Sequence, residues 1–430
     1  MRNRILSNWL RAIGGRSMHP SIPFEEVAPD LVAVTTTRLA DLLGVIEMDL
    51  SELEPRDSPR FFVDGVQRSA IVEELYISIP PTPVVASHIA VGAFTHEANK
   101  VKPVITRDVL LILLPRSTLM QLPNAPSELS NVPIPMFDNT GNFYVKACQS
   151  QLREGVNVFL VDSSLTFQRN VRVTIQESEL AAVGKIRQTA LNRINAVRRA
   201  LEFGIVSELR KRYPDDLIVV DGPLARMMFL IYARLADTRL EYLEDLADVR
   251  RSYEFLSRIV GIVKVVKQVP QSGLEHAFDI KDTVVNVPVF RFTDSSQIRD
   301  EESGRASSVE EEFRHLICCF VWLRPELREH IPVTGSITGG LVRIDIPIPA
   351  IIDYDPQWAS PGFQIDISDG RIRARIEQIL RGILAERLPL PPLSRVHKMF
   401  TELYTISEAE RLLRSNLLTP EDMRLIIRKI

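Results

Sequence analysis

The stretch LIVVDGPL, residues 217–224, runs four apolar residues directly into an acid, a glycine and a proline. A second stretch, RFFVDGVQ at residues 60–67, has the same form, with Asp64 and Gly65 after an apolar run. Short apolar runs bounded by turn residues predict buried strands, and Asp-Gly is a common turn dipeptide. The two stretches therefore predict two buried strands that each end in a carboxylate, at Asp64 and at Asp221.

The elements around these strands predict the fold class. Apolar runs separated by turn residues between positions 58 and 95 predict three strands in an antiparallel meander, the first ending at Asp64. A long run without proline, with apolar residues every three or four positions, predicts a helix from about Glu177 to Arg212. The strand that ends at Asp221 follows, and further helices and strands come after it. This is the element order of an RNase H-like fold, in which the first and fourth strands are neighbours in a mixed sheet.

We therefore predict an α/β protein with an RNase H-like mixed sheet core flanked by helices, an inserted β-rich region, and helical N- and C-terminal segments. In residues 1–55, apolar side chains such as Leu42 and Ile46 recur at helical spacing, which predicts an N-terminal helical or docking segment. Residues 56–430 form the main domain, and the insertion falls at about residues 97–176.

The composition limits which classes of protein remain open. Apolar residues make up 45% of the chain and charged residues 25%, as in globular proteins with a sizeable core. The formal net charge is −3, so any contact with nucleic acid must come from local patches. The three cysteines give neither a disulfide framework nor a zinc motif, and the pair Cys318–Cys319 lies in an apolar run typical of core packing. No apolar run reaches the roughly 18 residues that span a bilayer, so we expect a cytoplasmic protein that does not act at a membrane.

Two carboxylates at the ends of neighbouring buried strands predict a cation between them. Like charges placed together lower stability unless a cation neutralises them. Mg²⁺ and Mn²⁺ prefer oxygen ligands, and two such ions about 4 Å apart can promote phosphodiester cleavage. The glycine after each acid would let a phosphate backbone come close. The alternative is that each Asp-Gly pair is only a turn.

A third ligand is expected from the long helix that lies between the two strands in the sequence. Glu202, in RRALEFG, stands among apolar residues and is the first choice, and Glu208 is its alternative. Asp162, in VNVFLVDSSL, also ends an apolar run and is an alternative to Asp221. Asp221 is preferred because a long helix with an acid precedes it.

The chain resembles the NurA nucleases in several segments that occur in the family's order. They are VDGVQ at 63–67, the helix with Glu202 followed by LIVVDGPL, VGIVKVVK at 260–267, LVRIDIP at 341–347, and LPLPPLSRVHKMF at 388–400. Together these segments extend over most of residues 58–415. One departure is that Val66 and Gln67 stand where the family often has a serine after the first Asp-Gly. This difference is typical of a divergent or inactive member.

The resemblance implies an RNase H-like core, a nuclease site that depends on Mn²⁺ or Mg²⁺, and a homodimer. It also implies four metal-binding and catalytic residues: Asp64, Glu202, Asp221 and His397. Three basic residues could contact DNA phosphates without reading the base sequence: Lys264, Lys267 and Arg343.

We expect a metal-dependent DNA nuclease, an exonuclease at DNA ends, that acts with a HerA- or FtsK-like hexameric ATPase in DNA end processing or phage defence. The alternative is a catalytically inactive dimeric adaptor that binds DNA and a ring ATPase. Metal binding separates the two hypotheses, since only the nuclease needs a cation between its acids.

Overall fold

The structure is a computed structural model of the chain. It describes the following residues: 15–16, 22–23, 35–37, 40–54, 58–75, 82–97, 100–115, 136–137, 143–144, 157–163, 165–168, 171–174, 183–224, 246–264, 266, 268–270, 272–281, 283–292, 315–323, 341–360, 363–386 and 403–429.

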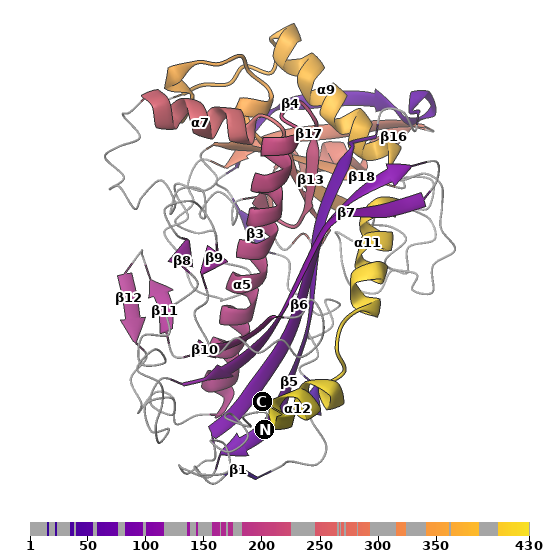
Figure 1. The fold of residues 1–430 in the computed structure, drawn as a ribbon. Helices are drawn as coiled ribbons and strands as arrows, with labels where there is room; N and C mark the ends of the chain where they lie inside the picture. Colours follow the sequence, from indigo (N-terminus) through magenta and orange to yellow (C-terminus); the bar gives the residue numbers. More distant parts are fainter. Residues whose placement is uncertain are drawn as a thin grey trace.

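One large mixed sheet forms the centre of the described part of the chain (Figure 1). Its strands lie in the order β10-β7-β6-β5-β13-β14-β19-β18-β17-β16, while β1 and β2 pair with β5 and β4 pairs with β17. Their bounds are β1 Gly15–Arg16, β2 Ile22–Pro23, β4 Ala40–Asp49, β5 Phe61–Leu75, β6 Thr82–Glu97, β7 Lys100–Leu114, β10 Asn157–Asp162, β13 Ile218–Asp221, β14 Ile259–Val263, β16 Ile280–Lys281, β17 Val284–Phe292, β18 Leu316–Trp322 and β19 Leu341–Pro347.

The remaining described elements are three strand pairs and the helices. The pairs are β3 Thr35–Thr37 with β15 Gln268–Pro270, β8 Met136–Phe137 with β9 Phe143–Tyr144, and β11 Leu165–Gln168 with β12 Val171–Thr174. The α-helices are α5 Val183–Arg212, α7 Leu246–Leu256, α9 Gly370–Ala385, α11 Tyr404–Ser415 and α12 Pro420–Lys429. Short 3₁₀ helices are η2 Leu50–Glu52, η5 Leu274–Phe278, η7 Ile348–Ala350 and η8 Pro356–Ala359.

The predicted contact between the two acidic strands is confirmed. β13 lies parallel to β5, with Ile218 opposite Phe61 and Val220 opposite Val63. The next residue in each strand is Asp221 and Asp64, so the two aspartates are adjacent in this register. β14 continues the sheet in parallel on the far side of β13.

The strands before α5 form the predicted antiparallel meander, but with different bounds. The two runs predicted as separate strands around Gly65 are one strand, β5, because pairing with β6 continues from Phe62 to Leu75. The third strand of the meander is β7, which the sequence analysis placed in the insertion. Asp64 consequently lies inside β5 rather than at its end, and it is the neighbouring β13 that stops beside it.

The prediction of a helical segment in residues 1–55 is wrong where the structure describes that segment. Ala40–Asp49 is strand β4, which pairs antiparallel with β17. Ile46 and Met48 are buried while Glu47 between them is exposed, which is the alternation of a strand. Pairing with β17 overrides the helical spacing of the apolar residues, since local patterns give way to tertiary contacts.

The predictions for several later elements are confirmed. The long helix before LIVVD is α5, and the apolar runs with Cys318 and with Arg343 are strands β18 and β19. Cys318 and Cys319 are fully buried core residues, and burial raises the pKa of both thiols. The helix predicted after Leu224 lies outside the described residues. None of the described helices is long and apolar enough to cross a membrane.

Side chains of β5 alternate between two faces of the sheet, each covered by a helix. Gly65 faces α5, because a β-carbon added there would meet Glu202 and Arg198 of that helix. The next residue, Val66, packs with Ala409 of α11 on the opposite face. Figure 1 shows α5 and α11 on opposite sides of the long strands. Since alternate residues of a strand share a face, Asp64 points to the α11 side together with Val66.

Candidate active site

Asp64 is a buried carboxylate with one unsatisfied oxygen. The residue is 4% exposed, and its Oδ1 accepts a hydrogen bond of 2.7 Å from the backbone N–H of Gly65. Its Oδ2 is buried and has no hydrogen-bond partner among the described residues. A buried carboxylate oxygen without a donor is costly, so this atom indicates a place where a donor or a cation would bind.

Asp221 presents a second unsatisfied oxygen on the adjacent strand. Its Oδ2 lies 2.9 Å from Nζ of Lys264, which directly follows β14. Its Oδ1 is buried, and no residue in the described part of the chain forms a hydrogen bond with it. Because β5 and β13 are parallel and in register, both aspartates point to the same face of the sheet.

The surroundings of Asp64 disfavour the ionised form of its carboxyl group. Burial raises the pKa of Asp64 well above its ordinary value, and the charge of Asp221 raises it further. Lys264 acts in the opposite direction, while Glu410 and Glu202 add to the increase. The positive charge of Lys264 therefore offsets the nearby carboxylates only in part. A bound divalent metal ion would favour the ionised form of Asp64.

Glu202 approaches this pair from α5, on the far side of β5. It is buried, forms an ion pair with Arg198 at 3.6 Å, and lies against Gly65. The absence of a side chain at Gly65 is what lets the glutamate approach the strand so closely. Glu208, the alternative, instead binds Arg107 and Arg212. Of the two helical acids, Glu202 is therefore the one that lies against β5 next to Asp64, on the face of the sheet opposite the aspartate pair.

Substitution Gly65→Ala is expected to displace Glu202 and to destabilise the fold. The new methyl group would overlap Oε1 of Glu202 and lie 2.9 Å from Cγ1 of Val91. Overpacking of this kind costs about 1–3 kcal/mol, which chemical denaturation would measure. Gly370→Ala is the matched control, because a β-carbon there would meet nothing within 4 Å. Equal stability of the two variants would contradict this description of Gly65.

Asp162 is separated from the pair by the sheet order. It ends β10, which pairs with β7 at the outer side of the meander. Three strand spacings divide β10 from β5, or about 14 Å at the usual separation of neighbouring strands. The sheet order therefore favours Asp221 over Asp162 as the partner of Asp64.

The three basic residues predicted to contact DNA are Lys264, Lys267 and Arg343, and they differ in position. Lys264 lies at the aspartate pair, whereas Lys267 falls outside the described residues. Arg343 is buried, 2% exposed, and its Nε lies 2.8 Å from Oδ1 of Asp345. It is paired in register with Val263, whose side chain points to the face opposite that of the aspartate pair. A side chain buried there does not fit the predicted contact with DNA phosphates.

The described residues fit a divalent cation through two carboxylates rather than through a complete set of ligands. No group of three or more His, Cys, Asp or Glu side chains in the described ranges is arranged to hold a metal ion. The two buried oxygens without partners, on Asp64 and Asp221, are the atoms that suit such an ion. His397, predicted as a further ligand, lies outside the described residues.

One acid near the site has no counterpart in the predictions. Glu410 of α11 is buried. Its charge raises the pKa of Asp64 more than the charge of Glu202 does. In the sequence it is an ordinary glutamate of an amphipathic helix, so only the packing of α11 on the sheet distinguishes it.

No protein-family model matches the chain, and no curated protein matches it. One solved structure to which the chain is similar is the NurA nuclease from Sulfolobus solfataricus, at 10% sequence identity and a TM-score of 0.34. The match covers 90% of this chain and 85% of that one.

Proposed function

We propose that the protein is a divalent-metal-dependent deoxyribonuclease whose site is built on Asp64 and Asp221. The observation that carries this proposal is the pair of buried, unpartnered carboxylate oxygens on two adjacent parallel strands. Such a pair is destabilising without a cation, and Mg²⁺ and Mn²⁺ bind oxygen ligands of this kind.

The sheet order supports an RNase H-like core. The antiparallel meander β5-β6-β7 is followed by α5, and β13 and β14 then extend the sheet from β5 in parallel. This is the order in which the first and fourth strands of an RNase H-like fold become neighbours, with one acid on each.

The residues of the site have distinct tasks in this proposal. Asp64 and Asp221 would hold the cation, which when bound supplies activation of a water and neutralises charge at the phosphate. Lys264, whose Nζ lies 2.9 Å from Oδ2 of Asp221, would contact a phosphate oxygen of the DNA. Among the described residues, nothing lies within 4 Å of a β-carbon placed at Gly222, the residue after Asp221. Glu202 was predicted as a metal ligand, but it lies on the Gly65 face of β5, opposite the aspartate pair, and does not take that role in this proposal. His397 keeps the role of a further metal ligand that the motif resemblance implies.

The substrate and the partners follow from the motif resemblance. We propose exonucleolytic cleavage at DNA ends by a homodimer that acts with a HerA- or FtsK-like hexameric ATPase, in DNA end processing or antiviral defence. The ATPase would feed DNA to the nuclease, because the chain itself has no phosphate-binding loop motif and little net charge.

Two observations favour the alternative of an inactive adaptor. The described residues hold no three-ligand metal group, and Lys264 already neutralises one oxygen of Asp221. In that case the lysine would replace the cation permanently, and the dimer would only guide DNA into the ATPase ring.

A cleavage assay distinguishes the two functions. The purified protein is incubated with linear duplex and single-stranded DNA in Mn²⁺, Mg²⁺ or EDTA, with and without the ATPase partner. Degradation that requires metal is the expected result. Intact DNA under every condition, including with the partner present, would overturn the nuclease and support the adaptor.

A further inference from the structure

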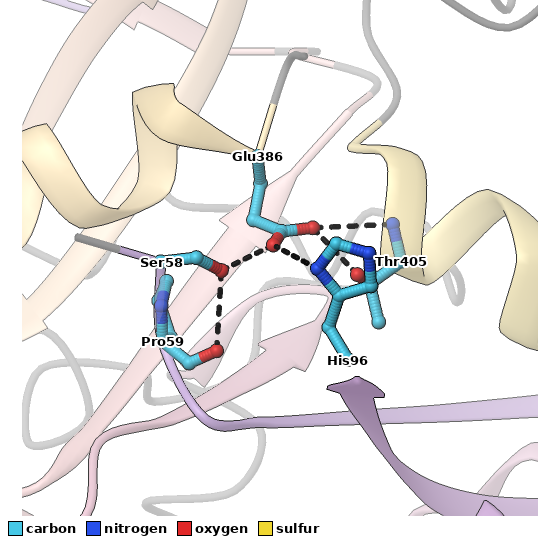
Figure 2. Close-up of polar contacts among 5 residues, drawn as sticks. All are labelled: Ser58, Pro59, His96, Glu386 and Thr405. Carbon is cyan, nitrogen blue, oxygen red and sulfur yellow. Dashed lines mark hydrogen bonds and ion pairs between the residues drawn. The ribbon is translucent and has the colours of Figure 1, made fainter. Parts of the chain in front are cut away.

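The beginning of α11 is held by a buried carboxylate at the end of α9 (Figure 2). Oε2 of Glu386 accepts hydrogen bonds from the backbone N–H of Thr405, at 3.2 Å, and from its hydroxyl, at 2.6 Å. The backbone carbonyl of Glu386 also accepts from the N–H of Tyr404, at 3.0 Å. A carboxylate at these first N–H groups caps the helix, which has no capping side chain at Leu403.

The same carboxylate also contacts β6 and the segment that leads into β5. Its Oε1 accepts a hydrogen bond from the hydroxyl of Ser58, shortly before β5, and lies 4.0 Å from Nδ1 of His96 on β6. Figure 2 shows Glu386 between these side chains and Thr405. The start of α11 is therefore fixed relative to β5 and β6.

The segment directly after α11 is fixed to the same two strands. Arg68 of β5 donates hydrogen bonds to the carbonyls of Leu417 and Leu418, at 3.1 and 3.2 Å. His88 of β6 accepts a hydrogen bond of 2.9 Å from the N–H of Leu418 through Nδ1. The other ring nitrogen therefore carries the proton and donates to Asp108, at 3.2 Å. With both ends anchored, α11 is held in one position over the strands.

This position places Glu410 on the face of the sheet to which Asp64 points. Ala409 and Leu413 of α11 pack on Val66 and Ala90, and Val66 lies two residues from Asp64 on the same face. Glu410, between those contact residues in sequence, is itself buried, and its Oε1 binds Nε of Arg414 at 2.6 Å. Glu202, by contrast, comes from the face to which Gly65 points.

We propose that Glu410 is the third carboxylate of the cation site and that it reaches the ion through an intervening water. This inference rests on the proposed metal site at Asp64 and Asp221. An indirect contact agrees with the lack of a three-ligand group in the described ranges. Mg²⁺ typically keeps several waters and takes only one or two protein carboxylates directly. Glu410 is thus a positioning residue, which orients a water of the ion rather than the ion itself.

The test is the affinity for Mn²⁺, measured by calorimetry on the full-length protein without DNA. Glu410→Gln keeps the size of the side chain and removes its charge. It is expected to weaken Mn²⁺ binding about 10–100-fold, as the loss of an indirect metal contact does. Glu408→Gln is the matched control on the same helix, because Glu408 binds the exposed Arg411. The Glu408→Gln variant should bind Mn²⁺ with the affinity of the wild type.

The possible outcomes separate this inference from the proposed function. Wild-type affinity in Glu410→Gln, together with loss of binding in Asp64→Asn, would overturn the role of Glu410 and leave the metal site intact. No Mn²⁺ binding by the wild type would overturn both. Equal weakening in Glu408→Gln would assign the effect to general charge on α11 and overturn the inference. Thermal melting in EDTA checks that each variant is folded.

Discussion

Asp64→Asn and Asp221→Asn are each expected to lower metal-dependent DNA cleavage by on the order of 10³-fold. Each substitution keeps the shape of the side chain and removes one of the two negative charges that would hold the cation. The measurement is the initial rate of degradation of linear DNA in Mn²⁺, at equal protein concentration. Glu208→Gln is the control, because Glu208 binds Arg107 and Arg212 instead of facing the aspartate pair. A rate within a few-fold of wild type in either aspartate variant would contradict the site.

Loss of activity in Asp64→Asn is not expected to come from unfolding. The pKa of Asp64 is raised in the folded protein, so the native state keeps this proton at pH values where the unfolded chain, with a pKa near 3.8, has lost it. The stabilising contribution of Asp64 is therefore present at acid pH and is lost as the pH rises through the raised pKa. At neutral pH the uncharged Asn should make the metal-free protein more stable, by about 0.5–2 kcal/mol. A lower melting temperature for this variant in EDTA would contradict that reasoning.

Asp345→Ala is expected to destabilise the fold by about 3–5 kcal/mol, because it leaves Arg343 buried without its carboxylate partner. Asp345 is fully buried and accepts hydrogen bonds from Arg343 Nε at 2.8 Å and from the N–H of Leu224 at 3.1 Å. Leu224 follows Asp221 closely in the chain, so this bond also fixes the backbone just beyond the proposed metal site. The free energy of unfolding from urea denaturation is the quantity to measure.

Two controls make this second prediction specific. Glu254→Ala removes the partner of Arg250 in an exposed ion pair at 3.0 Å, and should change stability by less than about 1 kcal/mol. The double variant Arg343→Met with Asp345→Leu replaces the buried pair by apolar groups and should recover most of the lost stability. A cost below about 1 kcal/mol for Asp345→Ala would show that the buried pair is not needed.

The sequence alone predicted that the two central strands β5 and β13 are neighbours. Short apolar runs that end in an acid, with a long proline-free helix between them, predicted that Asp64 and Asp221 would be neighbours, and the register of β5 and β13 bears this out. The strand bounds were less predictable, because Asp-Gly is common in turns while Gly65 continues an extended strand. Whether a strand ends there depends on its pairing with β6, a contact distant in sequence.

The surroundings of the site were harder to predict for the same reason. Arg343 was expected to contact DNA, but its alternation on β19 directs it to Asp345 on the other face of the sheet. Glu410 was not singled out, since its relation to Asp64 exists only because α11 is anchored at Glu386 and at the β5–β6 pair. Local pattern predicts which residues are buried, whereas the face and the partner of a buried charge are set by tertiary packing.

In the proposed function, Asp64 and Asp221 together hold one divalent cation site. Its most direct test is a titration with Mn²⁺, followed by the electron paramagnetic resonance signal of the free ion, for the wild type, Asp64→Asn and Asp221→Asn. Saturable binding by the wild type that is lost in both variants is the predicted result. Equal binding by all three proteins, or none by the wild type, would contradict the claim and leave LIVVDGPL as a buried strand that ends in a turn.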